Sequence, residues 1–222
     1  MSEINKSLLT ENQNLSKFEI TENFTCIRFI EQNKERFELE FNLEKGTSFN
    51  TFLIRNNEEL FIIHPPEKQY LNSFIKVLSN FFDQFKLHKI NVISGHINPQ
   101  IIETIKKIST QFQNLTITCS NPGFKLISEL WHQRNPNLKD FVEIKLPPIN
   151  IIKKELNLEL NNISLELIPV PTARWPGGLI IYERNEEILL SEKIFLHTLH
   201  LNIGLKQIEL VQKLIENTFM IA

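Results

Sequence analysis

Two spacings of hydrophobic residues divide this chain into candidate strands and helices. Alternating or continuous apolar runs rich in β-branched and aromatic residues are typical of strands, and apolar residues three and four apart are typical of helices. Strands are predicted over 24–31, 35–43, 49–55, 60–63, 89–93, 115–119, 141–146, 156–160, 164–170, 179–182 and 188–190. Helices are predicted over 68–82, 101–111 and 122–133.

The order of these elements predicts the fold class. A meander of strands comes first, a strand and helix alternation follows, and further strands complete the pattern. This order favours an α/β protein built as an αββα sandwich, with two sheets face to face and helices outside. A chain of 222 residues with 41% hydrophobic residues can bury one core, so one domain is expected over 18–201. Residues 1–17 are expected to be a disordered leader, and 202–222 a separate tail.

Composition narrows the functional classes. A formal net charge of -2 argues against a general nucleic-acid binder, which would carry a basic stripe. No apolar run approaches the roughly 20 residues needed to span a bilayer, so no membrane insertion and a cytoplasmic location are expected. Cys26 and Cys119 lie inside predicted strands and are expected to be buried, reduced thiols rather than a disulfide or a metal pair.

The first candidate site is the turn Ser94-Gly95-His96-Ile97-Asn98-Pro99-Gln100, between a predicted strand and a predicted helix. Such a turn is a common place for ligand-binding groups. An intact metal turn would combine imidazole nitrogens with ionised carboxylates. Here only His96 fits, because Asn98 and Gln100 are neutral amides and Ile101 cannot bind a metal.

Two further clusters come later in the chain. In Pro169-Val170-Pro171-Thr172-Ala173-Arg174-Trp175-Pro176-Gly177-Gly178, prolines fix the backbone and glycines allow close approach, which predicts a rigid loop after a strand. Arg174 either faces an anion from a pocket wall or only stacks on Trp175 or meets solvent. Ser191-Glu192-Lys193 follows the last predicted strand, where a charged triplet is usually a solvated turn.

Taken together, these motifs resemble the flavodiiron proteins, also called A-type flavoproteins, in their cyanobacterial diflavin branch. The resemblance runs from about Phe37 to Phe195. It is carried by Gly46-Thr47-Ser48-Phe49-Asn50, by the Ser94 turn, by Cys119-Ser120-Asn121-Pro122, by Arg174-Trp175-Pro176 and by Ser191-Glu192-Lys193. It implies a metallo-β-lactamase fold. In the family, this domain carries a di-iron centre, FMN is bound by another domain, and oxygen is reduced to water with photosynthetic electrons.

By position, the resemblance implies that six residues stand where the family has its metal site, and only His96 is still a metal-binding residue type. The six are His96, Asn98, Gln100, Ile101, Arg174 and Lys193. Arg174 and Lys193 would repel iron, and instead suggest an anion pocket or internal pairing, for example with Glu192. We therefore expect no metal, no cofactor and no catalytic residue in this chain, as in a non-metal-binding subgroup of the family that is thought to act with a partner paralogue.

The tail from Gly204 onward has a helical pattern, with Ile208, Val211, Leu214 and Ile215 on one side, and does not resemble the family. Codons can be chosen for it so that a shifted frame yields a family-like segment, from which we expect a truncated or frameshifted product. The sandwich would then be incomplete at its C-terminus, and inactive alone without flavodoxin-like and flavin-reductase-like domains. The alternative is a short non-enzymatic adaptor that binds an anion, a full-length flavodiiron paralogue or itself. An active metallo-hydrolase is disfavoured by the missing ligands.

Overall fold

The computed structural model describes residues 15–31, 47–133, 144–171 and 177–191. Seven strands form one sheet in chain order. They are β1 (Leu15–Thr21), β2 (Phe24–Glu31), β3 (Thr47–Asn56), β4 (Glu59–Ile63), β5 (Lys89–Ile93), β6 (Leu115–Ser120) and β7 (Ile149–Ile152). Four further strands form a second, antiparallel sheet in the order β11-β10-β9-β8. They are β8 (Leu156–Leu160), β9 (Ile163–Pro169), β10 (Leu179–Glu183) and β11 (Ile188–Leu190).

The two halves of the first sheet are connected differently. Strands β1 to β4 pair antiparallel, whereas β4 to β7 pair parallel. The parallel strands are joined by helices α1 (Leu71–Phe85), α2 (Pro99–Gln111) and α3 (Asn121–His132), and a short 3-10 helix, η1 (Lys68–Tyr70), precedes α1. Parallel pairing brings the carboxyl ends of β4, β5 and β6 to one edge, because the three strands run in the same direction.

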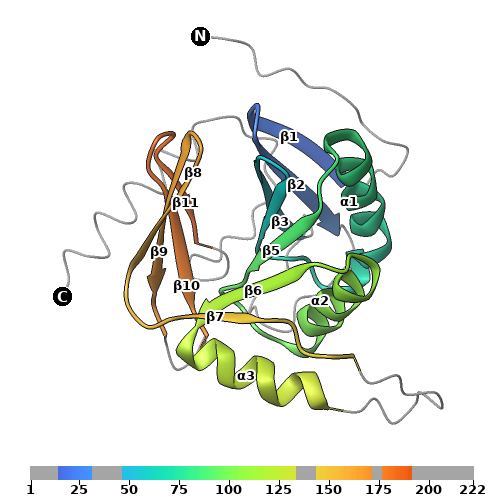
Figure 1. Cartoon of the computed structure of the whole chain (residues 1–222), viewed down its shortest axis with the longest axis vertical. Helices are drawn as coiled ribbons and strands as arrows, with labels where there is room; N and C mark the ends of the chain where they lie inside the picture. The colour runs from blue at the N-terminus through green and yellow to red at the C-terminus, as the bar shows by residue number, and fades with distance from the viewer. Residues whose placement is uncertain (1–14, 32–46, 134–143, 172–176, 192–222) are drawn as a thin grey trace.

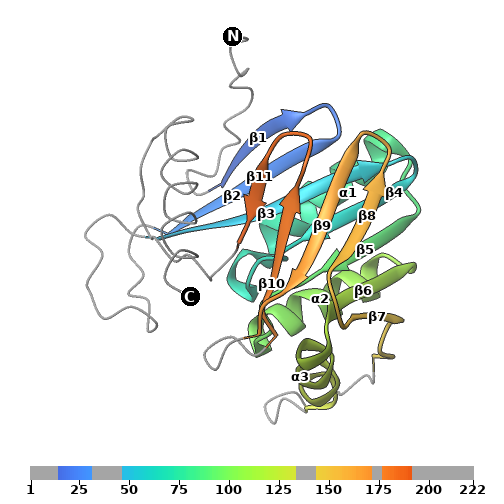
Figure 2. The same cartoon turned by 90° about the vertical axis from the view of Figure 1, so that its left-hand side faces the viewer.

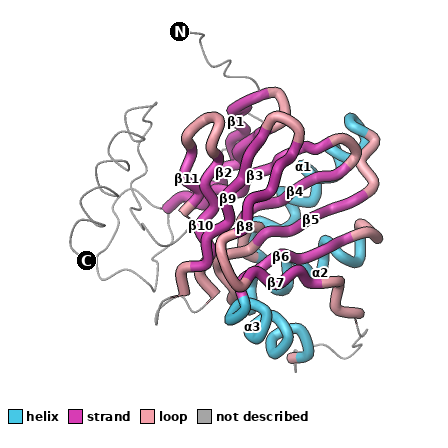
Figure 3. Tube along the Cα trace, turned by 60° about the vertical axis from the view of Figure 1, so that its left-hand side comes forward, coloured by secondary structure: helices cyan, strands magenta, loops and turns pink. Residues whose placement is uncertain are grey.

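Two hydrophobic cores separate three layers. All three described α-helices lie on one face of the seven-stranded sheet, and the four-stranded sheet lies on its other face (Figure 1). Phe29, Phe74 and Leu78 are buried in the core between helices and sheet. Ile54 and Leu165 are buried in the core between the two sheets. Figure 2 shows the four-stranded sheet in front of the larger one. Figure 3 shows α1 and α2 behind the strands and α3 below them.

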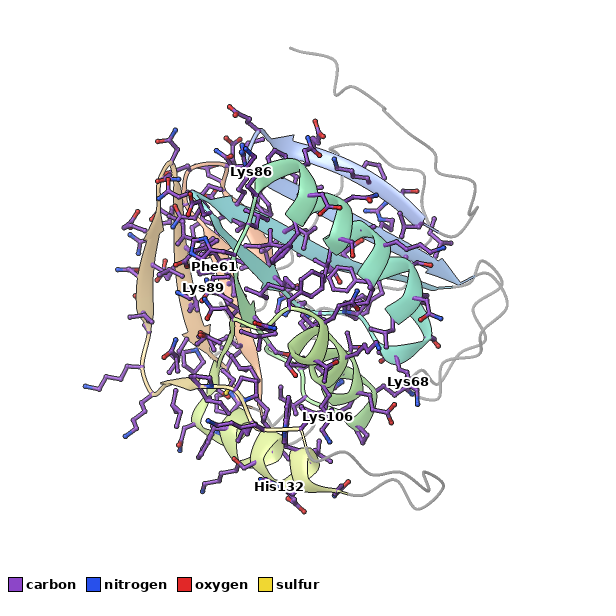
Figure 4. The ribbon with its side chains drawn as sticks, turned by 45° about the vertical axis from the view of Figure 1, so that its right-hand side comes forward. Phe61, Lys68, Lys86, Lys89, Lys106 and His132 are labelled. Carbon is purple, nitrogen blue, oxygen red and sulfur yellow. The ribbon has the colours of Figure 1, made fainter. Side chains whose placement is uncertain are left out.

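Polar contacts also fasten the helix layer. Lys68 forms an ion pair with Glu103 of α2, and Lys106 of α2 lies over the Trp131 ring of α3, 5.4 Å from its centroid (Figure 4). The indole Nε1 of Trp131 donates to the carbonyl of Ile144 at 2.8 Å. These contacts link η1 to α2, α2 to α3, and α3 to the segment that leads into β7.

The structure confirms the predicted two-sheet sandwich with helices outside, and corrects two local expectations. Leu15, Ser16 and Lys17, expected in the leader, belong to β1 and pair with β2. The strand expected over 141–146 is absent from its described part, residues 144–146, and the strand that pairs with β6 is β7. The predicted strand 35–43 and the tail 202–222 lie outside the described residues.

Both cysteines are buried free thiols, as the sequence predicts. Cys26 of β2 and Cys119 of β6 have no disulfide. Burial raises the pKa of each thiol to about 12. Because the thiolate is the nucleophile and the metal ligand, both side chains are chemically inert core residues at neutral pH.

Candidate functional site

The candidate site lies at the edge where the parallel strands end. His64 follows β4, the turn from Ser94 to Asn98 follows β5, and Ser120 ends β6. The paired residues Ile63 and Ile93 place the first two turns side by side. The backbone N–H of Ser94 donates to the carbonyl of Thr118 at 3.1 Å, which joins the second turn to β6. In α/β sheets this edge is the usual place for ligands.

His96 is closed in by its own turn. The side chain is buried, with 8% of the residue exposed. The Oδ1 atom of Asn98 accepts from the backbone N–H of Ile101 at 2.8 Å and caps α2. This fixes the amide so that Nδ2 faces His96, where it lies 3.1 Å from Nε2. Since an amide nitrogen can only donate, Nε2 of His96 accepts, and the lone pair that would bind a metal is occupied.

The other described metal-like positions do not converge on His96. Gln100 is exposed in the first turn of α2. Ile101 is fully buried in the core between helices and sheet. Oε1 of Glu67 accepts from Nδ2 of Asn98 at 3.4 Å, so the amide has a second protein partner. The turn is thus a hydrogen-bonded and apolar structure built around one imidazole.

His64 is a residue of this edge that the sequence reading missed. It is 1% exposed and has a φ of 55°, in the left-handed region that favours glycine. Its Nε2 donates to the carbonyl of Leu190 at the end of β11, at 3.3 Å. Burial lowers the pKa of the imidazole to about 4. The sequence signal is a histidine that directly follows a predicted strand and precedes Pro65 and Pro66.

Glycines let the motif-bearing turns meet. A Cβ on Gly95 would lie 2.4 Å from the carbonyl oxygen of Leu179, and a Cβ on Gly177 would lie 3.2 Å from the Cα of Gly123. Oγ of Ser120 donates to the carbonyl of Gly177 at 2.9 Å. The sequence prediction of close approach is therefore confirmed at Gly177, which packs on the turn after β5 and on the start of α3, while residues 172–176 of the predicted rigid loop lie outside the described residues.

Arg174 and Lys193, the two residues of the expected anion pocket, lie outside the described residues, as does Glu192. The anion pocket therefore stays a prediction. Within the described ranges, no group of three histidine, cysteine, aspartate or glutamate side chains could hold a metal ion. The described donors at this turn are one imidazole, one capping amide and the Glu67 carboxylate that is hydrogen-bonded to that amide. They do not fit a di-iron centre, which needs several carboxylates and imidazoles.

The fold and this edge define the class, a metallo-β-lactamase-like sandwich. Residues 47–217 match the model of the ODP family of beta-lactamase domains, and the chain belongs to that family. The match runs into segment 202–222, whose separate origin stays a prediction. Among the helices that the structure describes, none is long and apolar enough to cross a membrane.

The chain is similar to cyanobacterial diflavin flavoproteins and to solved flavodiiron cores. The putative diflavin flavoprotein A 6 of Nostoc sp. PCC 7120 is 30% identical over 187 residues, which are 84% of this chain and 30% of that protein. The metal-soaked Flv1 flavodiiron core from Synechocystis sp. PCC6803 has a TM-score of 0.72 at 27% identity, covering 85% of this chain and 44% of that chain. The fragment 1–254 of putative diflavin flavoprotein A 5 from Nostoc sp. PCC 7120 has a TM-score of 0.69 at 26% identity. The match covers 90% of this chain and 74% of that fragment.

Proposed function

We propose that this chain is a metal-free flavodiiron-type domain, related to the NAD(P)H:oxygen oxidoreductases, that is inactive alone and acts in electron transport to oxygen by binding a full-length flavodiiron paralogue. Family membership supports the reaction class. The chain spans 30% of the length of the Nostoc relative, and the proposal assigns flavin binding and oxygen reduction to the full-length paralogue. The hydrogen bond between Asn98 and His96 carries the metal-free part of the proposal.

That hydrogen bond opposes metal binding in two ways. A metal at Nε2 of His96 would displace the Nδ2 donor of Asn98, and the Asn98 oxygen could turn toward the metal only by uncapping α2. Loss of an N-cap costs about 1 kcal/mol. A neutral amide would also replace the carboxylate charge that offsets a divalent cation. The turn therefore serves the fold, and no step of a reaction passes through it.

Metal content tests the first part. The purified chain is incubated with Fe(II) without oxygen, desalted and measured by elemental analysis. The flavo di-iron protein of Thermotoga maritima is loaded in parallel as the positive control. We expect iron far below one atom per chain. About two irons per chain that survive desalting would contradict the proposal, and the circular dichroism spectrum of the same sample shows that the chain is folded.

Partner binding tests the second part. The chain is mixed with the full-length Nostoc relative, and sedimentation velocity and NAD(P)H-dependent oxygen consumption are measured. We expect a complex, no oxygen consumption by the chain alone, and a changed rate when both are present. Co-sedimentation without a change in rate would favour the non-enzymatic adaptor. Sedimentation of two independent species would remove the partner from the proposal.

A further inference from the structure

His64 is fixed to the first sheet through both of its backbone groups. Its N–H donates to the carbonyl of Ile93 at 2.9 Å, and its carbonyl accepts from Oγ1 of the fully buried Thr51 at 2.9 Å. A φ of 55° is unfavourable for a histidine, and such a conformation persists only where the surroundings fix it. The imidazole therefore leaves the sheet in one direction.

That direction leads to the second sheet. Nε2 of His64 donates to the carbonyl of Leu190, which is 126 positions later in the chain. Strand β11 has three residues and lies at the edge of its sheet, where it pairs with β10 through Ile181 and Leu190. A short edge strand is the element most easily released. The His64 bond adds a contact at the end of this strand from the opposite layer.

Strand β10 is anchored by other groups. Oγ of Ser120 donates to the carbonyl of Gly177 just before β10, and the backbone of Leu179 packs on Gly95. The start of β10 is thus fastened by the turns after β5 and β6. The end of β11 is fastened by the turn after β4, which makes the two contacts separable by mutation.

We propose that His64 is a latch, a conformational device that holds the end of β11 closed against the first sheet and releases it without unfolding the sandwich. The latch uses one imidazole and one backbone carbonyl, and needs neither metal nor flavin. It is therefore independent of the function proposed above, and it is tested without a partner or a redox reaction.

Hydrogen exchange of the full chain, followed by mass spectrometry, tests the latch. In His64→Asn the new residue tolerates a left-handed backbone but is too short to reach Leu190. We expect peptides over 188–191 to exchange about tenfold faster, the scale for losing one hydrogen bond, while peptides over 163–169 keep wild-type rates. Ser120→Ala is the matched control, and should accelerate exchange over 177–181 but not over 188–191.

Two results would overturn the latch. One is wild-type exchange over 188–191 in His64→Asn, and the other is equal acceleration throughout the chain, which would make His64 an ordinary core residue. His64→Gln retains an amide donor on a longer side chain and should restore slow exchange over 188–191. If His64→Asn does not fold, NMR of the wild-type Hε2 proton decides, since fast exchange of that proton with water would refute the bond.

Discussion

The turns after β5 and β6 are built alike and differ in what they bind. Each leaves a parallel strand at the same edge and starts a helix with a polar cap and a proline in the first turn. Asn98 accepts from the backbone N–H of Ile101, and Ser120 accepts from that of Gly123 at 3.2 Å. Both caps satisfy a helix N-terminus from within the chain.

The second bond of each cap shows the difference. Ser120 donates across to the carbonyl of Gly177, whereas Asn98 donates back to His96 of its own turn. The Asn98 amide donates only to His96 and Glu67 on its own side of the molecule, whereas the Ser120 hydroxyl donates to the segment that leads into β10 of the other sheet. A motif therefore gives the position of a turn, while the donors and acceptors present decide its chemistry.

The third turn of this edge contains His64, and lowering the pH should destabilise the fold there. We expect this to be the largest of the predicted effects on the free energy of unfolding. The folded-state pKa of His64, about 4, lies below the ordinary value of 6.5, so the unfolded state binds the proton first as pH falls. The His64 contribution is complete above pH 6.5 and is lost between 6.5 and 4, about 3 kcal/mol in total. Urea unfolding at a series of pH values, compared with His64→Gln, measures it. An equal pH slope in both proteins would refute the assignment.

Gly95 in the turn after β5 and Gly123 in the first turn of α3 should differ sharply in the stability lost when each is replaced by alanine. In Gly95→Ala the new methyl group would meet the Leu179 carbonyl at 2.4 Å, and backbone atoms cannot easily move. In Gly123→Ala the nearest atom is Oγ of Ser120 at 3.2 Å, which can give way by a few tenths of an ångström. We expect the free energy of unfolding to fall by about 3 kcal/mol in Gly95→Ala and by less than about 1 kcal/mol in Gly123→Ala. Both values are measured by urea denaturation. Equal losses would mean that the backbone at this edge can move to make room for the methyl group of Gly95→Ala.

Removing the caps compares the two turns directly. Ser120→Ala removes a cap and the bond to Gly177, and should cost about 2 kcal/mol. Asn98→Ala removes a cap and leaves His96 able to rotate, and should cost about 1 kcal/mol. Thermal and urea unfolding give both values. If Asn98→Ala were the more damaging of the two, the metal-like turn would be the principal fastening of this edge.

Asn98→Asp should have the smallest effect at neutral pH and the most distinctive pH dependence. Aspartate is an equally good cap, but its second oxygen cannot donate to Oε1 of Glu67 as the amide does, so that long hydrogen bond is lost. Stability should therefore fall by less than about 1 kcal/mol. A carboxylate beside Nε2 cannot donate, and should raise the pKa of His96 in the folded state. The added stability is present below the unfolded pKa of about 6.5 and is lost as pH rises through the folded pKa. NMR titration of His96 in both proteins checks the direction, and a lowered pKa in Asn98→Asp would contradict it.

Much of this protein follows from local sequence. Neighbouring residues predict two of the helices, which the structure begins at Pro99 and Asn121, two residues and one residue earlier than expected. They also predict the buried thiol of Cys119 and the parallel strands β5 and β6. A helix cap, the fixed φ of a proline and the alternation of apolar residues in a strand each depend on residues a few positions apart. The sequence alone therefore shows them. For the same reason, the absence of carboxylates beside His96 could be seen without a structure.

Tertiary structure decided what lies across the molecule. Strand β1 is formed by pairing with β2, for example of Leu15 with Phe29. Near Ile144, where a strand was expected, the Ile144 carbonyl accepts from Trp131 instead, and pairing with β6 begins only where the Pro148 carbonyl accepts from Ile117. The His64 contact to Leu190 joins residues 126 positions apart, and the Ser120 contact to Gly177 spans 57. Local propensity carries no information about such partners, because they are selected by the packing of two sheets whose strands come from distant parts of the chain.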